Sequence, residues 1–330
     1  MSNTIEKRKP PRIKHVFIFN PRSFRGNLQM DAVIDSIGQY FRTQQEADFS
    51  VLIARYPRDA LGLIQKQFDD GGKGKVLRVY AVGGDGMLFD CLNGIKGLPN
   101  TELAAIPYGN ANDFIRAFGT DKIEAFKKIP DIVTASAIPT DIMDAGINYA
   151  VNVCSAGLSA AVVVRTKALN EKMGAVVRSG SLFYQFMRFL STLGAVFDRT
   201  ITAQHYAITI DAQDYSGPYS QVIIANGPYY GGGKIAGLNA LPNDGLLDVT
   251  LFKSAGPLAT LWAMSAYNQG KIPANCVVLQ AKKITLQSEQ PVWIQMDGEF
   301  ILDTHIDCEI IPAGAAVAAV QGVHYKKPKT

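Results

Sequence analysis

Cysteine and histidine are scarce in this sequence, and neither is spaced as a metal site or a redox pair. The 330 residues include four cysteines, Cys91, Cys154, Cys276 and Cys308, and four scattered histidines. No C-x-x-C pair is present, which argues against a zinc finger and against a thiol-redox motif. Each cysteine lies in an apolar stretch, so we interpret all four as buried free thiols in a reducing compartment.

Long apolar runs are also missing. A membrane-spanning helix needs about 18 uninterrupted apolar residues, and the sequence contains no such stretch. The basic start, MSNTIEKRKPPRIK, is not followed by the apolar segment of a signal peptide. We therefore expect a cytoplasmic protein. If its substrate is a lipid, the protein must approach the membrane surface from outside. The basic lead-in, with Lys7, Arg8, Lys9, Arg12 and Lys14, could attract the protein to an anionic membrane surface, or it could be a solvated tail that only aids solubility.

Charge is modest. The net charge is +4, charged residues make up 19% of the chain, and hydrophobic residues make up 47%. This composition supports a large core, and the length favours two domains. Basic residues do not alternate with aromatic ones in any one stretch, so the sequence gives little support to nucleic-acid binding.

The first 135 residues alternate predicted strands and helices. Apolar, β-branched runs predict strands at 15–20, 49–54 and 76–82. Helical patterns follow each strand, at 28–41, 58–68 and 87–96. This alternation predicts an α/β domain with a parallel sheet.

The remainder of the chain, from 136 to 311, is rich in closely spaced β-runs and predicts a mainly antiparallel β-sandwich. A single long apolar helix is expected at 175–197. We place the domain boundary near 130–139, where two prolines occur. A last strand near 315–320 could return to the first domain, so that residues 312–330 would complete it; the sequence leaves this open. Strands are expected at Ala137–Ile147, Tyr149–Cys154, Ala203–Asp211, Tyr219–Asn226, Leu246–Lys253, Lys282–Ser288, Val292–Met296 and Ile306–Ile311.

A glycine-rich turn, Gly83-Gly84-Asp85-Gly86, joins a buried strand to a helix. Glycines let backbone approach a phosphate, and helix N-terminal amides attract anions. Read alone, the segment could equally be a tight strand–helix turn. It is not a Walker loop, because no GxxxxGK[ST] exists, and Phe89 occupies the third glycine position of a GxGxxG motif.

Two further polar loops follow predicted strands. The first, NPRSFRG, begins at Asn20, and the second, IPYGNANDF, contains Gly109, Asn110 and Asn112. Ligands bind beyond the carboxyl ends of parallel strands, so both loops could contact a nucleotide. Taken singly, the first could be a plain turn, and an Asn in the second could be a helix N-cap.

Two acidic turns lie in the second half. In LPNDGLLD, Asp244 and neighbouring carbonyls could hold a hard cation, although Asp-Gly is also a common hairpin turn. In Met296-Asp297-Gly298-Glu299, two carboxylates could supply a general base for a hydroxyl. A plain type I′ hairpin is the alternative there.

The order of these segments resembles the diacylglycerol kinase catalytic-domain superfamily, specifically the bacterial lipid kinases related to sphingosine and ceramide kinases. The resemblance runs from His15 to Val320 and rests on NPRSFRG, VGGDGMLFDCLNGI, IPYGNANDFIRAFG, DAGINYAVNVCSAG, NGPYYGGGKIAG, LPNDGLLDV and MDGE. NAD kinases share the GGDG loop but lack the pattern around YYGGG and DGLLD.

The resemblance implies an ATP site in the cleft between the two domains. It assigns phosphate and nucleotide contacts to Gly83, Gly84, Gly86, Asn20, Ser23, Gly109, Asn110 and Asn112. It assigns an active-site Mg²⁺ network to Asp85, Asp113 and Asp144. Asp297 matches the general base and Glu299 its neighbour. Asp244, with the carbonyls of Leu241 and Leu246, matches a structural magnesium site.

The implied activity is transfer of the γ-phosphate of ATP to a lipid alcohol. The apolar stretch Leu182–Val196 could form a wall of the lipid pocket or be an ordinary core helix. Met87, Phe89 and Asp90 depart from the usual Thr, Asn and Glu of the family. A catalytically weak nucleotide- or lipid-binding homologue and an NAD kinase therefore stay open as alternatives. The identity of the lipid and the oligomeric state, a homodimer included, also stay open.

Overall fold

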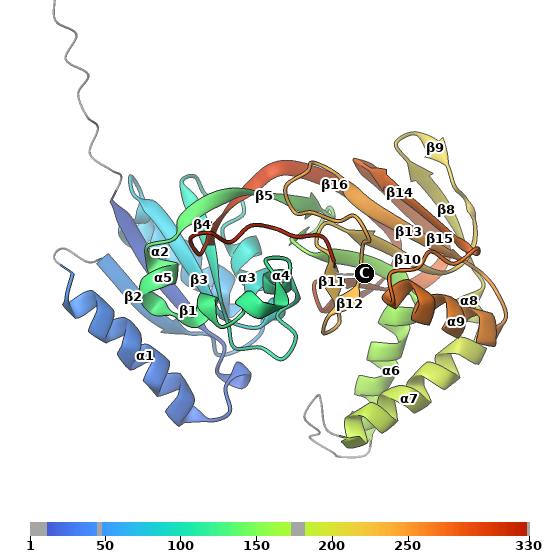
Figure 1. Ribbon diagram of the computed structural model, residues 1–330, viewed down its shortest axis with the longest axis horizontal. Helices are drawn as coiled ribbons and strands as arrows, with labels where there is room; N and C mark the ends of the chain where they lie inside the picture. Colours follow the sequence, from blue (N-terminus) through green and yellow to red (C-terminus); the bar gives the residue numbers. More distant parts are fainter. Residues whose placement is uncertain (1–11, 45–47, 173–181, 329–330) are drawn as a thin grey trace, which may run out of the picture.

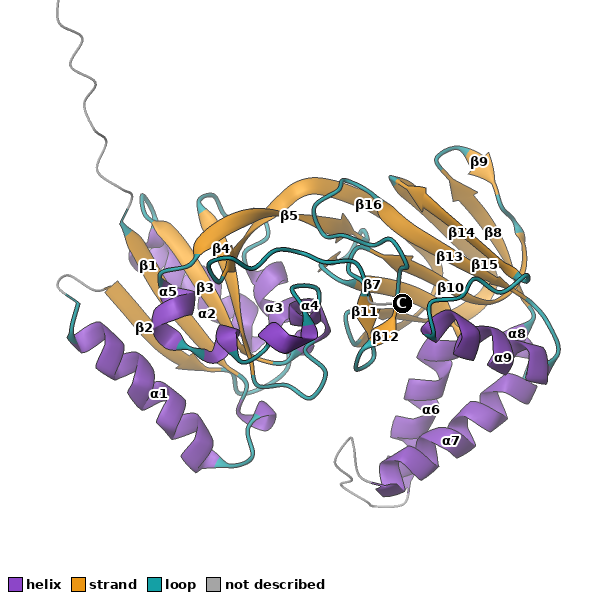
Figure 2. Ribbon diagram, in the orientation of Figure 1, coloured by secondary structure: helices purple, strands orange, loops and turns teal. Residues whose placement is uncertain are grey.

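The computed structural model describes residues 12–44, 48–172 and 182–328. Two lobes lie side by side, and long strands run from one into the other (Figures 1 and 2). The helices are α1 (Asn27–Arg42), α2 (Asp59–Gln67), α3 (Asp85–Gly94), α4 (Asp113–Arg116), α5 (Ile129–Val133), α6 (Leu158–Lys172), α7 (Leu182–Phe197), α8 (Arg199–Thr202) and α9 (Pro257–Asn268).

The strands alternate with helices only in the first lobe. They are β1 (Ile13–Phe19), β2 (Asp48–Ile53), β3 (Val76–Gly83), β4 (Thr101–Pro107), β5 (Ser136–Asp144), β6 (Tyr149–Ala150), β7 (Val153–Gly157), β8 (Gln204–Ile210), β9 (Gln213–Asp214), β10 (Gly217–Ala225), β11 (Tyr229–Tyr230), β12 (Lys234–Ile235), β13 (Leu247–Lys253), β14 (Cys276–Ala281), β15 (Lys283–Met296) and β16 (Glu299–Ala319).

The first lobe is a parallel sheet in the order β2-β1-β3-β4, with helices packed on it. β1, β3 and β4 are mostly buried, as the apolar β-branched runs predicted, whereas β2 at the edge of the sheet is only partly buried. Because all four strands point the same way, the loops that follow β1, β3 and β4 meet at one edge of the sheet. The predicted α/β domain is confirmed.

The second lobe is antiparallel. β10 pairs with β7 and β13, and β15 pairs with β7, β8 and β16. The predicted strands at 282–288 and 292–296 form the single strand β15, whose register with β16 shifts between Gln287 and Val292. The predicted antiparallel architecture is confirmed.

Strand β16 joins the lobes. Its early residues pair with β15, its later ones pair with β5, and Val317 pairs in parallel with Leu103 of β4. The strands of both lobes therefore belong to one continuous 14-stranded sheet, except β11 and β12, which form a separate pair. The chain after β16 stays with the first lobe, where Tyr325 stacks on Phe118 with ring centroids 4.4 Å apart.

Helix α3 also ties the lobes together. Phe89 is fully buried and packs in a cluster otherwise made of second-lobe residues such as Met143 and Met296. Asn93 donates to the carbonyl of Tyr149, and its Oδ1 accepts from the Tyr149 amide, each at 2.9 Å. These contacts fix the position of the GGDG turn, at the start of α3, relative to the second lobe.

Three expectations need correction. Helices α6 and α9 and strand β14 were not predicted. Part of the expected helix at 175–197 lies outside the described residues, which resume at α7.

Lys14 cannot be an exposed membrane contact, because it is buried in β1 and its Nζ donates to the carbonyls of Gln67 and Asp70. Lys7, Arg8 and Lys9 lie outside the described residues. None of the described helices is long and apolar enough to cross a bilayer.

Candidate functional site between the lobes

The glycine turn after β3 packs directly against the loop after β4. The amides of Tyr108 and Gly109 both donate to the Gly83 carbonyl, at 2.8 and 3.0 Å. A Cβ added at Gly109 would stand 2.3 Å from the Gly84 Cα. The glycines at 84 and 109 are thus required by a close approach of two backbones, in addition to any contact with a phosphate.

The loop after β1 adjoins the same turn. Asn20 caps the short 3₁₀ helix Pro21–Ser23, and its Oδ1 accepts from the Arg22 amide. A Cβ on Gly83 would meet the side chains of Asn20 and Ser23, each at 3.2 Å. Asn20, Ser23, Gly83 and Gly84 therefore lie together at the sheet edge.

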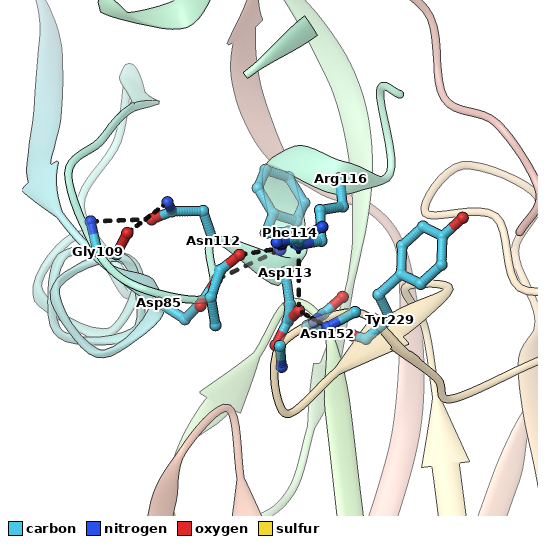
Figure 3. Close-up of polar contacts among 11 residues, drawn as sticks. Asp85, Gly109, Asn112, Asp113, Phe114, Arg116, Asn152 and Tyr229 are labelled. Carbon is cyan, nitrogen blue, oxygen red and sulfur yellow. Dashed lines mark hydrogen bonds and ion pairs between the residues drawn. The ribbon is translucent and has the colours of Figure 1, made fainter. Parts of the chain in front are cut away.

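Asn112 differs from its expected role. It has the left-handed backbone φ of 51°, and its amide side chain is turned back onto Gly109, accepting from the Gly109 amide and donating to its carbonyl (Figure 3). It therefore shapes the loop from within. Asn110 lines the cavity described next. Gly86 is exposed in the first turn of α3, with open space beside it.

A cavity of about 540 Å³ lies between the lobes and brings three predicted carboxylates together. Asp85 and Asp113 reach it from the first lobe, and Asp297 reaches it from the hairpin between β15 and β16. The hairpin has positive φ at Asp297 and Gly298, and Met296 pairs with Glu299, so it is a two-residue turn of the primed kind. The turn and the carboxylate site are therefore the same feature.

Asp297 is held rigidly. Its Oδ2 accepts from the amide of Val151 and its Oδ1 from that of Val153, both at 2.7 Å, and the Asn152 amide lies 3.2 Å from both oxygens. Burial nevertheless raises the pKa of Asp297 to about 7, against the effect of these donors. A fixed carboxyl group with such a pKa is suited to accept a proton near neutral pH.

Asp85 and Asp113 are the first residues of α3 and α4. The Asp85 Oδ1 accepts from the Phe114 amide at 3.3 Å (Figure 3). Burial, with the nearby charge of Asp113, raises the pKa of Asp85 to about 6. Asp113 bridges the lobes, because its oxygens accept from the amides of Gly232 and Gly233 at 2.9 and 2.7 Å. Burial raises the pKa of Asp113 as well.

Two of the carboxylates predicted for the active site do not line this cavity. Glu299 is exposed at the start of β16, beyond the lining residues. Asp144 lies at the end of β5, also outside the lining, where its Oδ1 accepts from the Gly146 amide. The three assembled carboxylates are thus Asp85, Asp113 and Asp297.

The LPNDGLLD turn forms a separate acidic group. The Asp244 Oδ1 accepts from the Leu246 amide, and the Leu241 carbonyl accepts from Asn243. Burial raises the pKa of Asp244, and the charge of Asp141 adds to this shift. Asp248 nearby has a buried Oδ1 that accepts no hydrogen bond from the described chain. Sequence reasoning missed Asp141 and Asp248 as members of this group.

The far part of the cavity is mostly apolar. Helix α6 supplies Leu158, Val162 and Val163, and Met264 and Phe300 add to the wall. Helix α7 contributes polar residues instead, namely Gln185, Arg188 and Thr192. The wall predicted from Leu182–Val196 is thus only partly right, because α7 presents its polar side to the cavity. Sequence reasoning also missed Asn152, Lys167, Tyr230, Lys234 and Gln295, whose motifs gave no sign that they converge.

Two family models together span most of the chain. Residues 14–145 match the diacylglycerol kinase catalytic domain, and residues 152–319, just over half of the chain, match the YegS C-terminal NAD kinase beta sandwich-like domain. This chain belongs to the diacylglycerol kinase catalytic-domain superfamily. The predicted membership, and with it the kinship to bacterial lipid kinases, is confirmed.

Relatives and structural neighbours of this superfamily member agree. Two Staphylococcus aureus proteins, from strains Mu3 and Newman, are named "Putative lipid kinase"; each is 27% identical over 71% of this chain and 74% of the relative. A crystal structure of a "putative diacylglycerol kinase" from Bacillus anthracis superposes with a TM-score of 0.68 at 23% identity, covering 96% of this chain and all of that one. A second B. anthracis diacylglycerol kinase structure gives 0.64 at 22%, covering 94% and 98%. At these identities, the crystal structures show the shared fold.

The departures from the superfamily pattern have structural partners. Met87 is buried, with its Sδ 3.8 Å from the Cys91 Sγ, and Phe89 packs into the second lobe. The Asp90 carboxylate accepts from the Arg58 amide at 3.0 Å. The Arg58 guanidinium lies over the Phe89 ring, 5.3 Å from its centroid. The residues that depart from the superfamily pattern therefore pack between the two lobes. The three carboxylates of the cavity are retained.

Proposed function

We propose that this protein transfers the γ-phosphate of ATP to the hydroxyl of a lipid alcohol in the cavity between the lobes. One observation supports this most strongly: a single cavity is lined both by three carboxylates, one of them Asp85 of the glycine turn, and by apolar side chains of the second lobe. Phosphoryl transfer needs positioning and charge neutralisation, and an acyl chain needs apolar surface.

In this proposal Asp297 accepts the hydroxyl proton, because it is the carboxylate fixed at the cavity by backbone donors from three successive residues. The glycine turn at 83–86 holds the phosphates, beside Asn20, Ser23, Gly109 and Asn110. The lipid hydroxyl enters from the apolar side and meets the γ-phosphate between Asp85 and Asp297.

The residues also suit Mg²⁺. Within the described residues, no three acidic, histidine or cysteine side chains form a ready-made cation site. Both carboxylate oxygens of Asp113 and of Asp297 accept hydrogen bonds from backbone amides at 2.7 to 2.9 Å, whereas the Phe114 amide lies farther from the Asp85 Oδ1, at 3.3 Å. Mg²⁺ in kinases is commonly held by one or two carboxylates, waters and the phosphates themselves. We assign it to Asp85, and a structural Mg²⁺ to Asp244 with the carbonyls of Leu241 and Leu246.

We further propose that the enzyme meets the bilayer through α7 and α9. One side of α7 exposes Phe186, Phe189 and Phe197, with 55%, 58% and 65% of their surface accessible, and α9 exposes Trp262 at 64%. The two helices touch, and the exposed basic residues Arg199 and Lys271 follow them directly. An anionic lipid surface complements aromatic side chains bordered by cations. This face adjoins the cavity, because α7 lines it with Gln185 and Arg188.

The test is phosphorylation of lipid extract by labelled ATP and Mg²⁺, with identification of the labelled product. Asp297→Asn is the matched control for a contaminating kinase. NAD serves as a second acceptor, and its phosphorylation in place of lipid would identify an NAD kinase. Absence of any labelled lipid, with nucleotide binding retained, would overturn the proposed activity and favour a binding homologue.

A further inference from the structure

Two half-buried cations line the cavity without a direct carboxylate partner among the described residues. Arg188 of α7 and Lys234 of β12 both line it, and both are half-buried. In the described part of the chain, neither side chain forms an ion pair with a carboxylate: the Asp113 carboxylate is occupied by Gly232, Gly233 and Arg116. Neither cation is therefore neutralised by a direct ion pair with a described residue, although both line a cavity with apolar side chains such as Leu158 and Val162.

The two cations also act on each other. Burial, together with the positive charge of Arg188, lowers the pKa of Lys234 to about 8. Like charges in a partly desolvated site destabilise one another unless an anion enters between them. An arrangement that costs stability in the empty protein, and that an anion would relieve, is expected of a binding site.

The pair lies across the lobe boundary from the nucleotide loops, although Gly233, next to Lys234, donates to Asp113 at the start of α4. Those loops follow β1, β3 and β4 in the first lobe, whereas Arg188 and Lys234 belong to the second lobe, beside Leu158, Val162 and Met264. A guanidinium group and an ammonium group together match the oxygens of a phosphate. Apolar surface next to them matches an acyl chain.

We propose that Arg188 and Lys234 bind a phosphate group carried by the lipid acceptor, so that the substrate class is an anionic lipid with a free hydroxyl. This rests on the proposed function. It goes beyond it, because a neutral lipid alcohol would leave both cations unmatched.

Binding can be tested without catalysis. Calorimetric titration would compare dihexanoyl phosphatidylglycerol with neutral dihexanoylglycerol, in the absence of ATP. We expect the wild type to prefer the anionic lipid, and Arg188→Met and Lys234→Met each to weaken its binding tenfold or more. Binding of the neutral lipid should change less than twofold. Lys253→Met is the matched control, since Lys253 is exposed on β13 and does not line the cavity.

Several results would overturn the inference. The inference is wrong if the wild type binds the two lipids with equal affinity or binds neither. It is also wrong if the variants lose the same affinity for the neutral lipid as for the anionic one. A rise of tenfold in the KM for ATP, with a neutral acceptor, would assign the cations to the donor phosphate instead. If the wild type binds the anionic lipid selectively but phosphorylates no lipid, the inference stands and the proposed kinase activity fails.

Thermal unfolding supplies an independent check of folding. Because Lys234 is desolvated beside another cation, Lys234→Met should unfold at the same or a higher temperature than the wild type without ligand. The wild type should gain in melting temperature from millimolar inorganic phosphate, and the variant should gain less. A variant that melts lower and gains equally from phosphate would contradict an uncompensated cation pair.

Discussion

Gly84 and Gly109 approach so closely that a Cβ added at Gly109 would lie 2.3 Å from the Gly84 Cα. Gly84 precedes the first residue of α3, and Gly109 follows β4, so this contact joins two of the loops at the edge of the parallel sheet. The shape of the proposed phosphate site depends on it.

Gly109→Ala should therefore disrupt the nucleotide loops. The added methyl group would meet backbone, which cannot rotate away as a side chain could, and overpacking of this kind costs about 1–3 kcal/mol. We expect a lower melting temperature and weaker ATP binding. Gly86→Ala is the control for stability, because a Cβ there meets nothing within 4 Å. Equal melting temperatures for the two variants would show that the loops are free to separate.

Asp297→Asn should lower kcat by about a hundredfold or more, the usual contribution of a general base. An amide cannot take the proton, and its NH₂ group would face backbone donors that now meet carboxylate oxygen. Glu299→Gln should change kcat by less than about threefold, since Glu299 is exposed outside the cavity. The proposed role is wrong if the two variants lose activity equally, or if Asp297→Asn keeps a tenth of kcat.

The pH dependence of stability should reveal the same carboxyl group. Its pKa is about 7 in the native state, against the ordinary value of 3.8. Between these values the unfolded chain releases a proton that the native protein keeps, so stability supplied by this group falls as pH rises. We expect the melting temperature of the wild type, relative to Asp297→Asn, to decrease from about pH 4 to about pH 7 and then level off. A difference that stays constant or increases over this range would contradict the raised pKa.

Magnesium should stabilise the protein through two separable sites. A Mg²⁺ ion that binds the carboxylates of the native protein stabilises it relative to the unfolded chain. Added MgCl₂ should therefore raise the melting temperature at pH 8. Asp85→Asn should remove the part of this gain that requires nucleotide. Asp244→Asn should remove the part seen without nucleotide. If both variants keep the full wild-type gain, neither assignment holds.

Much of the fold could be predicted because its strands are short apolar runs followed by glycine turns. The runs before Gly83 and Gly109 gave both the parallel sheet and the loops at its edge. Helix α6 was missed because the predicted strand ended at Cys154 and no element was assigned to the residues after it, whereas Gly157, with a φ of 102°, ends β7 and the helix begins at Leu158. Tertiary packing against α7 here outweighs local propensity.

The site residues that belong to a sequence motif could be predicted. Those that only tertiary packing brings to the cavity could not. Asp85, Asp113 and Asp297 occur in recognisable turns, and the lobes bring them together. Asp144 lies in such a segment too, but its strand ends outside the cavity. Arg188 and Lys234 are ordinary basic residues in sequence, and only the packing of α7 against the second lobe turns them inward.

The exposed aromatic side of α7 gives the last prediction. Leaving Phe186 and Phe189 in water costs free energy, and burying a large apolar side chain recovers about 1.5–3 kcal/mol. The double variant Phe186→Ser/Phe189→Ser should therefore weaken binding to vesicles of phosphatidylglycerol and phosphatidylcholine at least tenfold in co-sedimentation. Salt should weaken wild-type binding only partly, because cations contribute a screened share beside the apolar one. Leu28→Ser is the control, since Leu28 is 88% exposed on α1 in the other lobe. Removal of residues 1–11 should have a small effect if the α7 face supplies the membrane contact. If truncation abolishes binding and the double variant binds normally, the basic lead-in is the membrane contact and the α7 face is not.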